Sequence, residues 1–197
     1  MQPAAAAAVR GAPAAERILD VAERLVQTRG FNGFSYADVA AELGVTKPSL
    51  HYHFPSKAVL GEALIIRYAQ RFGAALGAME GDAGSARRRL RRYADLYADV
   101  LDRQRMCLCG MLAADLETLP QAMRAAVLRF FDTNESWLTG VLAEGRSRGE
   151  LRFRGPARAQ AQALIGTLEG AMLVARPYGD LTRFDAAAKQ LLNGLTP

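Results

Sequence analysis

The chain has 197 residues, half of them apolar, with a formal net charge of +5 and a pI near 9.6. This length and composition predict a folded protein with one large core or two small ones, and they exclude a disordered chain. No apolar run is long enough to span a bilayer, so we expect a cytoplasmic protein without a membrane partner. The positive charge suits an anionic partner such as nucleic acid but does not identify one.

The N-terminal region divides into a predicted tail and a predicted helix. Residues 1–13 are rich in Ala, Pro and Gly, which indicates a flexible tail, and they lack the basic leader of a signal peptide. From residue 14 to Arg29, the apolar residues Ile18, Ala22 and Leu25 fall on one helical stripe. We therefore expect an amphipathic helix that ends at Gly30.

The stretch from Ser35 to Lys57 predicts two short helices joined by a tight turn. Ser35 is a suitable N-cap for the first helix, and Gly44 ends it because glycine adopts the left-handed conformation at low cost. Thr46 caps the second helix, and Pro48 is tolerated in its first turn. A helix, a short turn with glycine and a second helix form the helix-turn-helix pattern.

Specific residues in this stretch resemble the DNA-binding motif of the TetR family of bacterial transcriptional regulators. The matching run is Val39-Ala40, Leu43-Gly44-Val45-Thr46-Lys47, Leu50 and Tyr52-His53-Phe54-Pro55-Ser56-Lys57. The run departs from the commoner family pattern at Pro48, where Gly or Ala is usual, and at His51, where Tyr is usual. The resemblance implies a helix-turn-helix DNA-binding domain over residues 14–57 and a ligand-binding and dimerisation domain over residues 58–197.

A protein helix fits the major groove of B-form DNA, where its first residues meet base edges. We therefore predict that Lys47 and Ser49 contact bases. The predicted phosphate contacts, and the other residues of the interface, are Ser35, Tyr36, Thr46, Pro48, His51, Tyr52, His53 and Lys57. The alternative for His51, His53 and Tyr52 is that they only cap the three-helix core. The two histidines point to different helix faces, so we predict no metal site.

The remaining chain predicts further helices and no reliable strand. Leu60, Leu64, Tyr68, Phe72 and Leu76 recur every four residues, which indicates a long helix that ends between Gly77 and Gly84. Helices then follow from Ser85 to Leu101, from Met106 to Leu116, from Pro120 to Gly145, from Pro156 to Arg176 and from Phe184 to Leu195. The fold class is therefore all-α, with about nine helices.

Two faces of the C-terminal region suggest binding surfaces. Small residues at helical spacing permit close approach of a partner helix, and the predicted homodimer interface is Ala159, Ala163, Gly166, Gly170, Phe184 and Leu191. The alternative is that this face packs within the monomer. Aromatic, Met and polar residues of the same region predict an apolar ligand pocket or else plain core: Tyr93, Tyr97, Cys107, Met111, Leu112, Phe130, Phe131, Asn134, Trp137, Leu168 and Met172.

The two cysteines, Cys107 and Cys109, are too close in the chain to link distant segments by a disulfide. A chain without such a disulfide is typical of a reducing compartment. Arg103, Arg105 and a helix start lie near Cys107, and positive charge favours the reactive thiolate. The segment is similar to that of TetR regulators that sense electrophiles or oxidants through a cysteine. The alternative is a buried, inert cysteine.

The most consistent function is a repressor that binds a palindromic operator as a homodimer, with recognition helices about 34–36 Å apart. The resemblance implies that a small hydrophobic or electrophilic effector releases the DNA. One alternative is a redox sensor acting through Cys107. Another class is a small-molecule-binding protein or a thiol-dependent helical enzyme. Because no metal-spaced cluster, phosphate-binding loop or nucleophile triad occurs, we predict no enzymatic activity and no cofactor.

Overall fold

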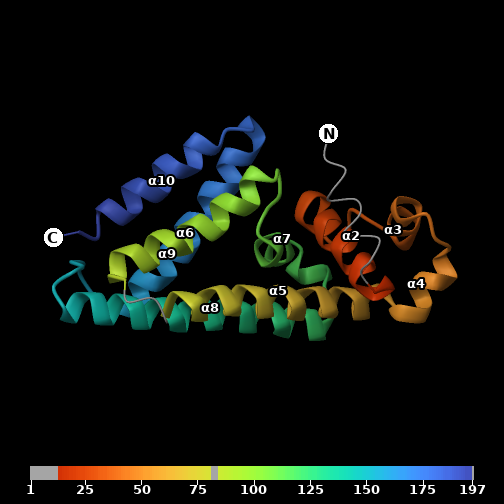
Figure 1. Cartoon of the computed structure of the whole chain (residues 1–197), viewed down its shortest axis with the longest axis horizontal. Coiled ribbons are helices and arrows are strands. Elements are labelled where there is room, and N and C mark those ends of the chain that lie inside the picture. The colour runs from red at the N-terminus through yellow and green to blue at the C-terminus, as the bar shows by residue number, and fades with distance from the viewer. Residues whose placement is uncertain (1–12, 81–83, 197) are drawn as a thin grey trace.

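A computed structural model describes residues 13–80 and 84–196, and within these ranges it contains helices and no strand. The predicted tail lies, except for Pro13, outside the described residues. The described residues form nine α-helices and two short 3-10 helices (Figure 1): α2 Ala14–Arg29, α3 Tyr36–Leu43, α4 Lys47–His53, α5 Lys57–Glu80, α6 Ala86–Asp102, α7 Leu108–Ala114, η1 Leu116–Thr118, α8 Gln121–Ser147, α9 Ala157–Ala175, η2 Arg176–Tyr178 and α10 Leu181–Asn193. The predicted all-α fold is confirmed.

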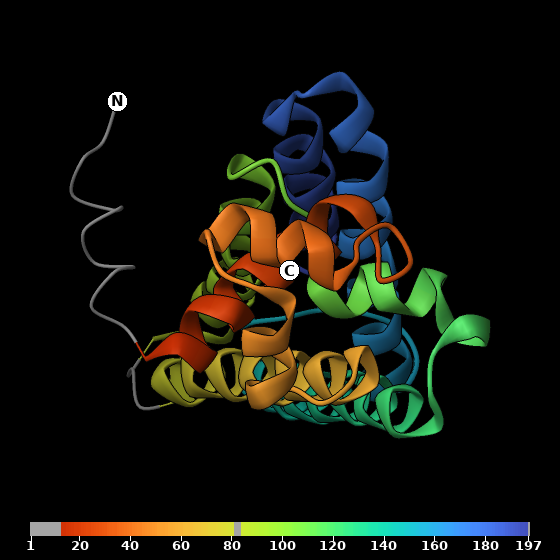
Figure 2. The same cartoon turned by 90° about the vertical axis from the view of Figure 1, so that its right-hand side faces the viewer.

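Helices α2, α3 and α4 form a small unit at one end of the molecule, which faces the viewer in Figure 2. Its core holds the fully buried side chains of Leu25, Val39 and Leu50. Gly44 has φ +65°, in the left-handed region that glycine adopts without steric cost, and it turns the chain from α3 into α4. The predicted helix-turn-helix is therefore present, with Ser35 and Asp38 forming the N-terminal capping box of α3.

The larger unit is a helical bundle. Helices α5 and α8 lie side by side along one edge of the molecule, and α6, α9 and α10 lie on the other side of the bundle (Figure 1). Helix α7 and η1 lie between this bundle and the small unit. Helix α5 ends at Glu80, within the predicted interval from Gly77 to Gly84, and it includes Gly77 because a glycine inside a helix costs only about 1 kcal/mol. Within residues 13–80 and 84–196, no helix is long and apolar enough to cross a membrane.

Candidate DNA-binding surface and core site

One face of α4 is exposed to solvent. Thr46, Lys47, Pro48 and Ser49 are exposed, and the Tyr52 side chain is 84% exposed. Only Leu50 on the opposite face is fully buried, and it anchors the helix to α2 and α3. A short helix that exposes a cation, hydroxyl groups and an aromatic ring offers suitable groups to a DNA groove. The roles of these residues in DNA binding stay predictions.

The structure places several other predicted contacts inside the unit. Tyr36 is buried, its hydroxyl donates a hydrogen bond to the Phe54 carbonyl oxygen at 2.7 Å, and burial raises the pKa of Tyr36 to about 12. The prediction that Tyr36 contacts phosphate is therefore wrong, because its hydroxyl closes the end of α4. The exposed His51 packs its ring on Tyr36, with ring centroids 4.7 Å apart. The half-buried His53 packs against Tyr52, and Ser35 donates its backbone N–H and hydroxyl to Asp38.

Lys57 also points inward. Its ammonium group donates hydrogen bonds to the carbonyl oxygens of Phe31 and Phe34, both at 2.5 Å, and lies over both aromatic rings. Burial lowers the pKa of Lys57, while Asp115 and Asp38 oppose this shift. Two backbone carbonyls hold this ammonium in the link between α2 and α3, and a phosphate contact through its third N–H stays a prediction.

We expect Lys57→Met to destabilise the protein by about 2 kcal/mol, since hydrogen bonds to charged groups contribute roughly that much and the two carbonyls lose their donor. Thermal unfolding followed by circular dichroism measures this loss. The exposed Lys189 on α10 supplies the control variant, Lys189→Met. Equal melting temperatures for the two variants contradict a structural role for Lys57.

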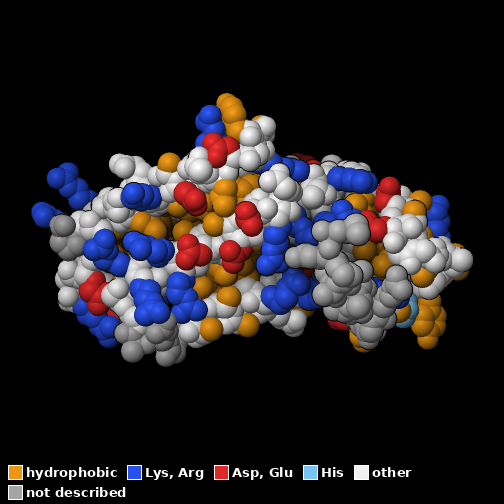
Figure 3. All heavy atoms as spheres, turned by 45° about the horizontal axis from the view of Figure 1, so that its top comes forward, with side chains coloured by type: hydrophobic (Ala, Val, Ile, Leu, Met, Phe, Trp, Pro, Cys, Tyr) orange, Lys and Arg blue, Asp and Glu red, His pale blue; other side chains and the backbone are white. Residues whose placement is uncertain are grey.

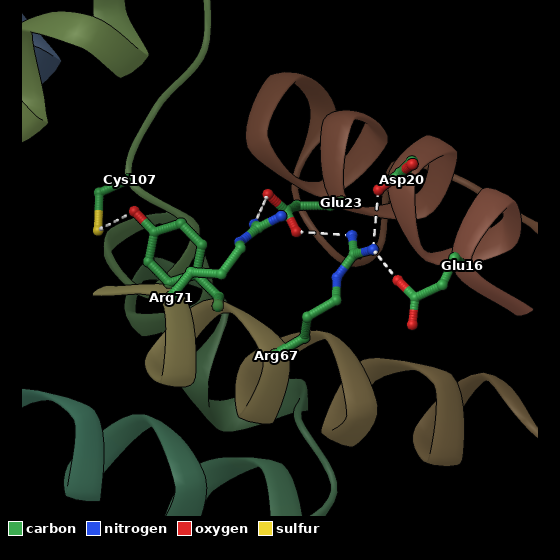
Figure 4. A network of polar contacts seen from close by, with 7 residues as sticks. Glu16, Asp20, Glu23, Arg67, Arg71 and Cys107 are labelled. Carbon is green, nitrogen blue, oxygen red and sulfur yellow. Dashed lines mark hydrogen bonds and ion pairs between the residues drawn. The ribbon is translucent and has the colours of Figure 1, made fainter. Parts of the chain in front are cut away.

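A network of ion pairs fastens α2 to α5 (Figure 4). Arg67 of α5 binds Glu16 at 3.0 Å, Asp20 at 2.8 Å and Glu23 at 2.9 Å, all on α2. Arg71, one turn further along α5, binds the other oxygen of Glu23. The side chains of Arg67 and Glu23 are only 14% and 9% exposed, so this network is screened less than a surface pair. A movement of α5 must therefore act on α2.

Three more contacts tie the small unit to the bundle. The Asp115 carboxylate accepts a hydrogen bond from the Phe31 backbone N–H at 2.8 Å, and Arg176 donates to the Thr28 carbonyl oxygen at the end of α2. The backbone N–H of Met106 donates to the Gln27 carbonyl oxygen at 3.1 Å. The junction thus joins α2 to α5, to the link between α6 and α7, to the end of α7 and to η2.

The predicted ligand-pocket residues form a packed core. Tyr93 donates to Asn134 at 3.2 Å and lies 3.0 Å from the Tyr97 hydroxyl, and its ring stacks on Trp137. Tyr93, Tyr97, Cys107, Leu112, Phe130, Asn134, Leu168 and Met172 are buried, whereas Met111, Phe131 and Trp137 are half-buried. The structure therefore brings the predicted pocket residues together, but in this conformation their side chains pack against one another and fill the predicted pocket.

An apolar cleft of about 280 Å³ opens beside this core, between α5 and α8. Ile65, Ile66 and Phe72 of α5 face Phe130 and Asn134 of α8 across it. Of the predicted pocket residues, only Phe130 and Asn134 line this cleft. Ile66 and Phe72 were missed, because apolar residues on a long helix such as α5 are also typical of ordinary core.

Cys107 is fully buried, and its thiol is kept protonated. Burial raises the pKa of the Cys107 thiol well above its ordinary value, and the Glu169 carboxyl and Cys109 raise it further. The Tyr68 hydroxyl donates to the sulfur at 3.7 Å. The prediction that Arg103 and Arg105 favour a thiolate is wrong, because the apolar core and a neighbouring carboxyl group outweigh them.

Glu169 of α9 is a half-buried residue whose carboxyl group reaches Cys107, and the sequence prediction missed it. Its Oε1 atom is buried without a hydrogen-bond partner, and its Oε2 lies so close to Gly110 that a Cβ there would clash. Burial raises the pKa of the Glu169 carboxyl to about 7, although a hydrogen bond with Cys107 lowers it in part. Glu169 is the only acidic residue of α9, and this isolated acid among apolar residues was the signal that could have found it.

This pKa makes the stability of the protein fall as pH rises. The unfolded carboxyl loses its proton near its ordinary pKa of 4.5, while the folded one keeps it until about 7. Between pH 4.5 and about 7 only the folded state binds the proton. The contribution of this carboxyl to stability is therefore fully present below pH 4.5 and is lost as the pH rises to about 7. We expect Glu169→Gln to be more stable than the natural chain at pH 8, by about 3 kcal/mol at most, and equal to it at pH 5. Melting curves of the natural chain and of Glu169→Gln at both pH values measure this difference, and the exposed Glu117→Gln is the control variant. Equal melting temperatures for Glu169→Gln and the natural chain at pH 8 would refute the raised pKa of Glu169.

Comparison with known families identifies both units. Residues 18–64 match the family described as bacterial regulatory proteins, tetR family, and residues 86–191 match the tetracyclin repressor-like C-terminal domain. The chain belongs to the TetR family. It is a DNA-binding transcriptional regulator, as the helix-turn-helix resemblance implied. The domain boundary at residue 57 stays a prediction.

Similar TetR-family proteins cover nearly the whole chain. A TetR-family regulator from Agrobacterium tumefaciens is 34% identical, with a TM-score of 0.89, over 93% of this chain and 97% of its own. The transcriptional repressor NemR of Escherichia coli K12 is 29% identical over 82% of this chain and 83% of its own, and its reduced form superposes with a TM-score of 0.77. The repressor DhaR of Mycobacterium sp. GP1 is 26% identical over 82% of this chain and 81% of its own.

Helix α9 of the larger unit exposes a stripe of small and apolar residues. The predicted interface residues Ala159, Ala163, Gly166 and Gly170 are all exposed, and the stripe continues to Leu173, which is 62% exposed. From α10, Leu191 is half-buried. Phe184 is only 1% exposed, so its predicted place in a dimer interface is wrong, because it packs α10 inside its own chain.

Proposed function

We propose that this TetR-family regulator is a repressor that binds a palindromic operator as a homodimer. The observation that carries the proposal is the face of α4, which leaves Lys47, Ser49 and Tyr52 exposed while Leu50 is buried beneath them. The relatives DhaR and NemR are both named transcriptional repressors. The exposed small-residue stripe of α9 supplies the dimer surface, and a DNA-bound role places the protein in the cytoplasm as a binding protein and not an enzyme.

The proposed effector is a small apolar molecule that enters the cleft between α5 and α8. Its walls are mostly apolar, and the buried Asn134 is a polar anchor whose side chain bonds to Tyr93. Helix α5 begins directly after the helix-turn-helix and carries Arg67 and Arg71 to α2. A ligand that displaces α5 therefore rotates α4, and it releases DNA if it binds the displaced conformation more tightly.

The junction contacts support the coupling of the small unit to the bundle. The ion pairs of Arg67 fix α2 to α5, and the bond from Arg176 fixes α2 to η2 after α9. The small unit is thus bonded to α5, which forms one wall of the proposed effector cleft, and to η2, which follows the proposed dimer helix α9. A sensor role for Cys107 is less well supported, because its buried, protonated thiol must first be exposed before it can react.

A half-turn insertion in the operator tests this function. The duplex to use is the DNA upstream of the protein's own gene, with the half-sites located by footprinting. Two rigidly held α4 helices need half-sites on one face of the duplex, so about 5 extra bp between them should abolish specific binding and about 10 should restore part of it. Equal affinity for all three duplexes, or no specific binding to any, refutes the proposal.

A further inference from the structure

A second cleft, of about 520 Å³, lies at the junction of the two units, on the side of α5 that faces α2 and α6. Its volume is within the range of small-ligand sites, which is about 300–1,000 Å³. Of the described residues, only Phe72 lines both this junction cleft and the proposed effector cleft between α5 and α8. A ligand in the junction cleft would therefore contact both units at a place of its own, whether or not the protein binds an operator.

The charged groups of the junction cleft balance one another. Its lining holds three carboxylates and three guanidinium groups, those of Asp20, Glu23, Asp99, Arg71, Arg103 and Arg105. Figure 4 shows Glu23 and Arg71 pointing toward each other, and Figure 3 shows basic and acidic side chains mingled across the middle of one face of the molecule. Burial and Arg24 lower the pKa of Arg105, and Glu23 and Asp20 oppose this lowering. A charged ligand would lose its hydration here and meet no net opposite charge, so the lining favours an uncharged ligand.

One polar atom of the inner wall lacks a partner. Gln27 of α2 lines the cleft and is only 3% exposed, and its Oε1 accepts no hydrogen bond from the described part of the chain. Tyr68 also lines the cleft, but its hydroxyl donates to the Cys107 sulfur at 3.7 Å. A buried acceptor without a donor costs free energy, which a bound donor recovers. The cleft therefore lacks a hydrogen-bond donor and not a charge.

The other walls suit an aromatic ring. Tyr68 and Phe72 of α5 have ring centroids 6.1 Å apart, and Leu96 and Val100 of α6 add apolar surface to the lining. Aromatic rings pack favourably on one another in tilted or edge-on geometry. Guanidinium groups also attract the face of an aromatic ring, and this attraction does not require a charged ligand. An aromatic body therefore suits this lining better than an alkyl chain does.

We propose that the junction cleft binds a small uncharged aromatic alcohol of the phenol class. The hydroxyl group of the ligand donates a hydrogen bond to Gln27 Oε1, and its ring lies against Phe72 and the apolar surface of α6. The hydroxyl oxygen accepts an N–H from a cleft arginine. Such a ligand supplies the missing donor and leaves the charge balance of the lining unchanged.

NMR titration of the isotope-labelled full chain with phenol, in the absence of DNA, tests the proposal. Phenol, like the tyrosine side chain, has a pKa near 10 and is uncharged at neutral pH. Anisole is the matched probe, because this methyl ether has the same ring but no O–H donor. We expect phenol to bind about tenfold more tightly than anisole, which corresponds to about 1.4 kcal/mol. The backbone amide signals that shift should include those of Gln27 and Val100.

Two substitutions separate the hydrogen bond from the cavity. Gln27→Leu removes the acceptor, so phenol should bind about tenfold more weakly while anisole binds as before. Ala75→Phe places a ring in the cleft and leaves the acceptor in place, so both probes should lose affinity roughly tenfold. Gln70→Leu, at an exposed glutamine of α5 outside the lining, is the control and should change neither affinity. Circular dichroism melts show whether each variant is folded, and Gln27→Met replaces Gln27→Leu if the latter is unfolded.

Benzoate tests the preference for an uncharged ligand, because it joins a negative charge to the same ring, and it should bind more weakly than phenol. The proposal is overturned if phenol does not bind, if anisole or benzoate binds as tightly as phenol, or if removal of the Gln27 amide leaves the affinity for phenol unchanged. Signals that shift only around Ile66 and Thr133 would also overturn it, because they would place phenol in the cleft between α5 and α8.

Discussion

Gly166→Arg is expected to convert the proposed homodimer to a monomer and to abolish operator binding. Gly166 lies in the exposed small-residue stripe of α9, and a Cβ at this position meets no atom of its own chain. The substitution therefore leaves the monomer intact but places a charge in the proposed dimer interface. Burying an unpaired charge costs several kcal/mol, so dimerisation should weaken roughly 100-fold or more.

Light scattering after size-exclusion chromatography measures this effect, because the mass should fall from twice 21.3 kDa to that of one chain. Gly140→Arg on α8 is the matched control, since Gly140 is also exposed, helical and free of nearby atoms. A Gly166→Arg protein that stays dimeric would place the interface elsewhere. A monomeric Gly140→Arg protein would show that any added arginine disrupts the assembly.

Arg67→Met is the second change from which we expect a large effect. Methionine keeps much of the side chain's length but leaves three carboxylates of α2 without their shared cation, and one of them, Glu23, is 9% exposed. Breaking a fully buried ion pair costs about 3–5 kcal/mol, and because Arg71 still compensates Glu23, we expect about 2 kcal/mol here. The melting temperature should fall, and the small unit should exchange its amide hydrogens faster than the bundle.

The control for Arg67→Met is Arg158→Met. Arg158 also binds a carboxylate on another helix, Glu135, but its side chain is 72% exposed, and surface pairs contribute about 0–1 kcal/mol. The two substitutions therefore separate the junction network from ion pairing in general. Equal, small losses of stability in the two variants, with uniform hydrogen exchange, would show that α2 is not fastened to α5 through Arg67.

The fold was predictable from the sequence because local signals specify most helices. Capping by Ser35, the left-handed turn at Gly44 and the four-residue spacing along α5 each depend on nearby residues. The end of α5 at Glu80 also lies within the predicted interval from Gly77 to Gly84. The type of each element is thus specified largely by local signals.

The sites were less predictable, because side-chain direction depends on the assembled junction. A lysine after a helix-turn-helix suggests a phosphate contact, but Lys57 is held by carbonyls of the link between α2 and α3. Arginines near Cys107 suggest a thiolate, but Glu169, more than sixty positions away in the chain, opposes it. Neither partner can be located from local spacing. The network of Arg67 and Arg71 was missed for the same reason.

The most direct test of the account is the operator preference of Lys47→Ala. Lys47 lies at the start of α4, is exposed, and is the predicted base contact, whereas Tyr52 is a predicted phosphate contact on the same face. Fluorescence anisotropy should compare the operator with single-base variants at several salt concentrations. We predict that Lys47→Ala changes the order of preference, costing about 1–3 kcal/mol at one position, while Tyr52→Ala weakens all duplexes alike. An unchanged preference and affinity in Lys47→Ala would contradict DNA recognition through α4.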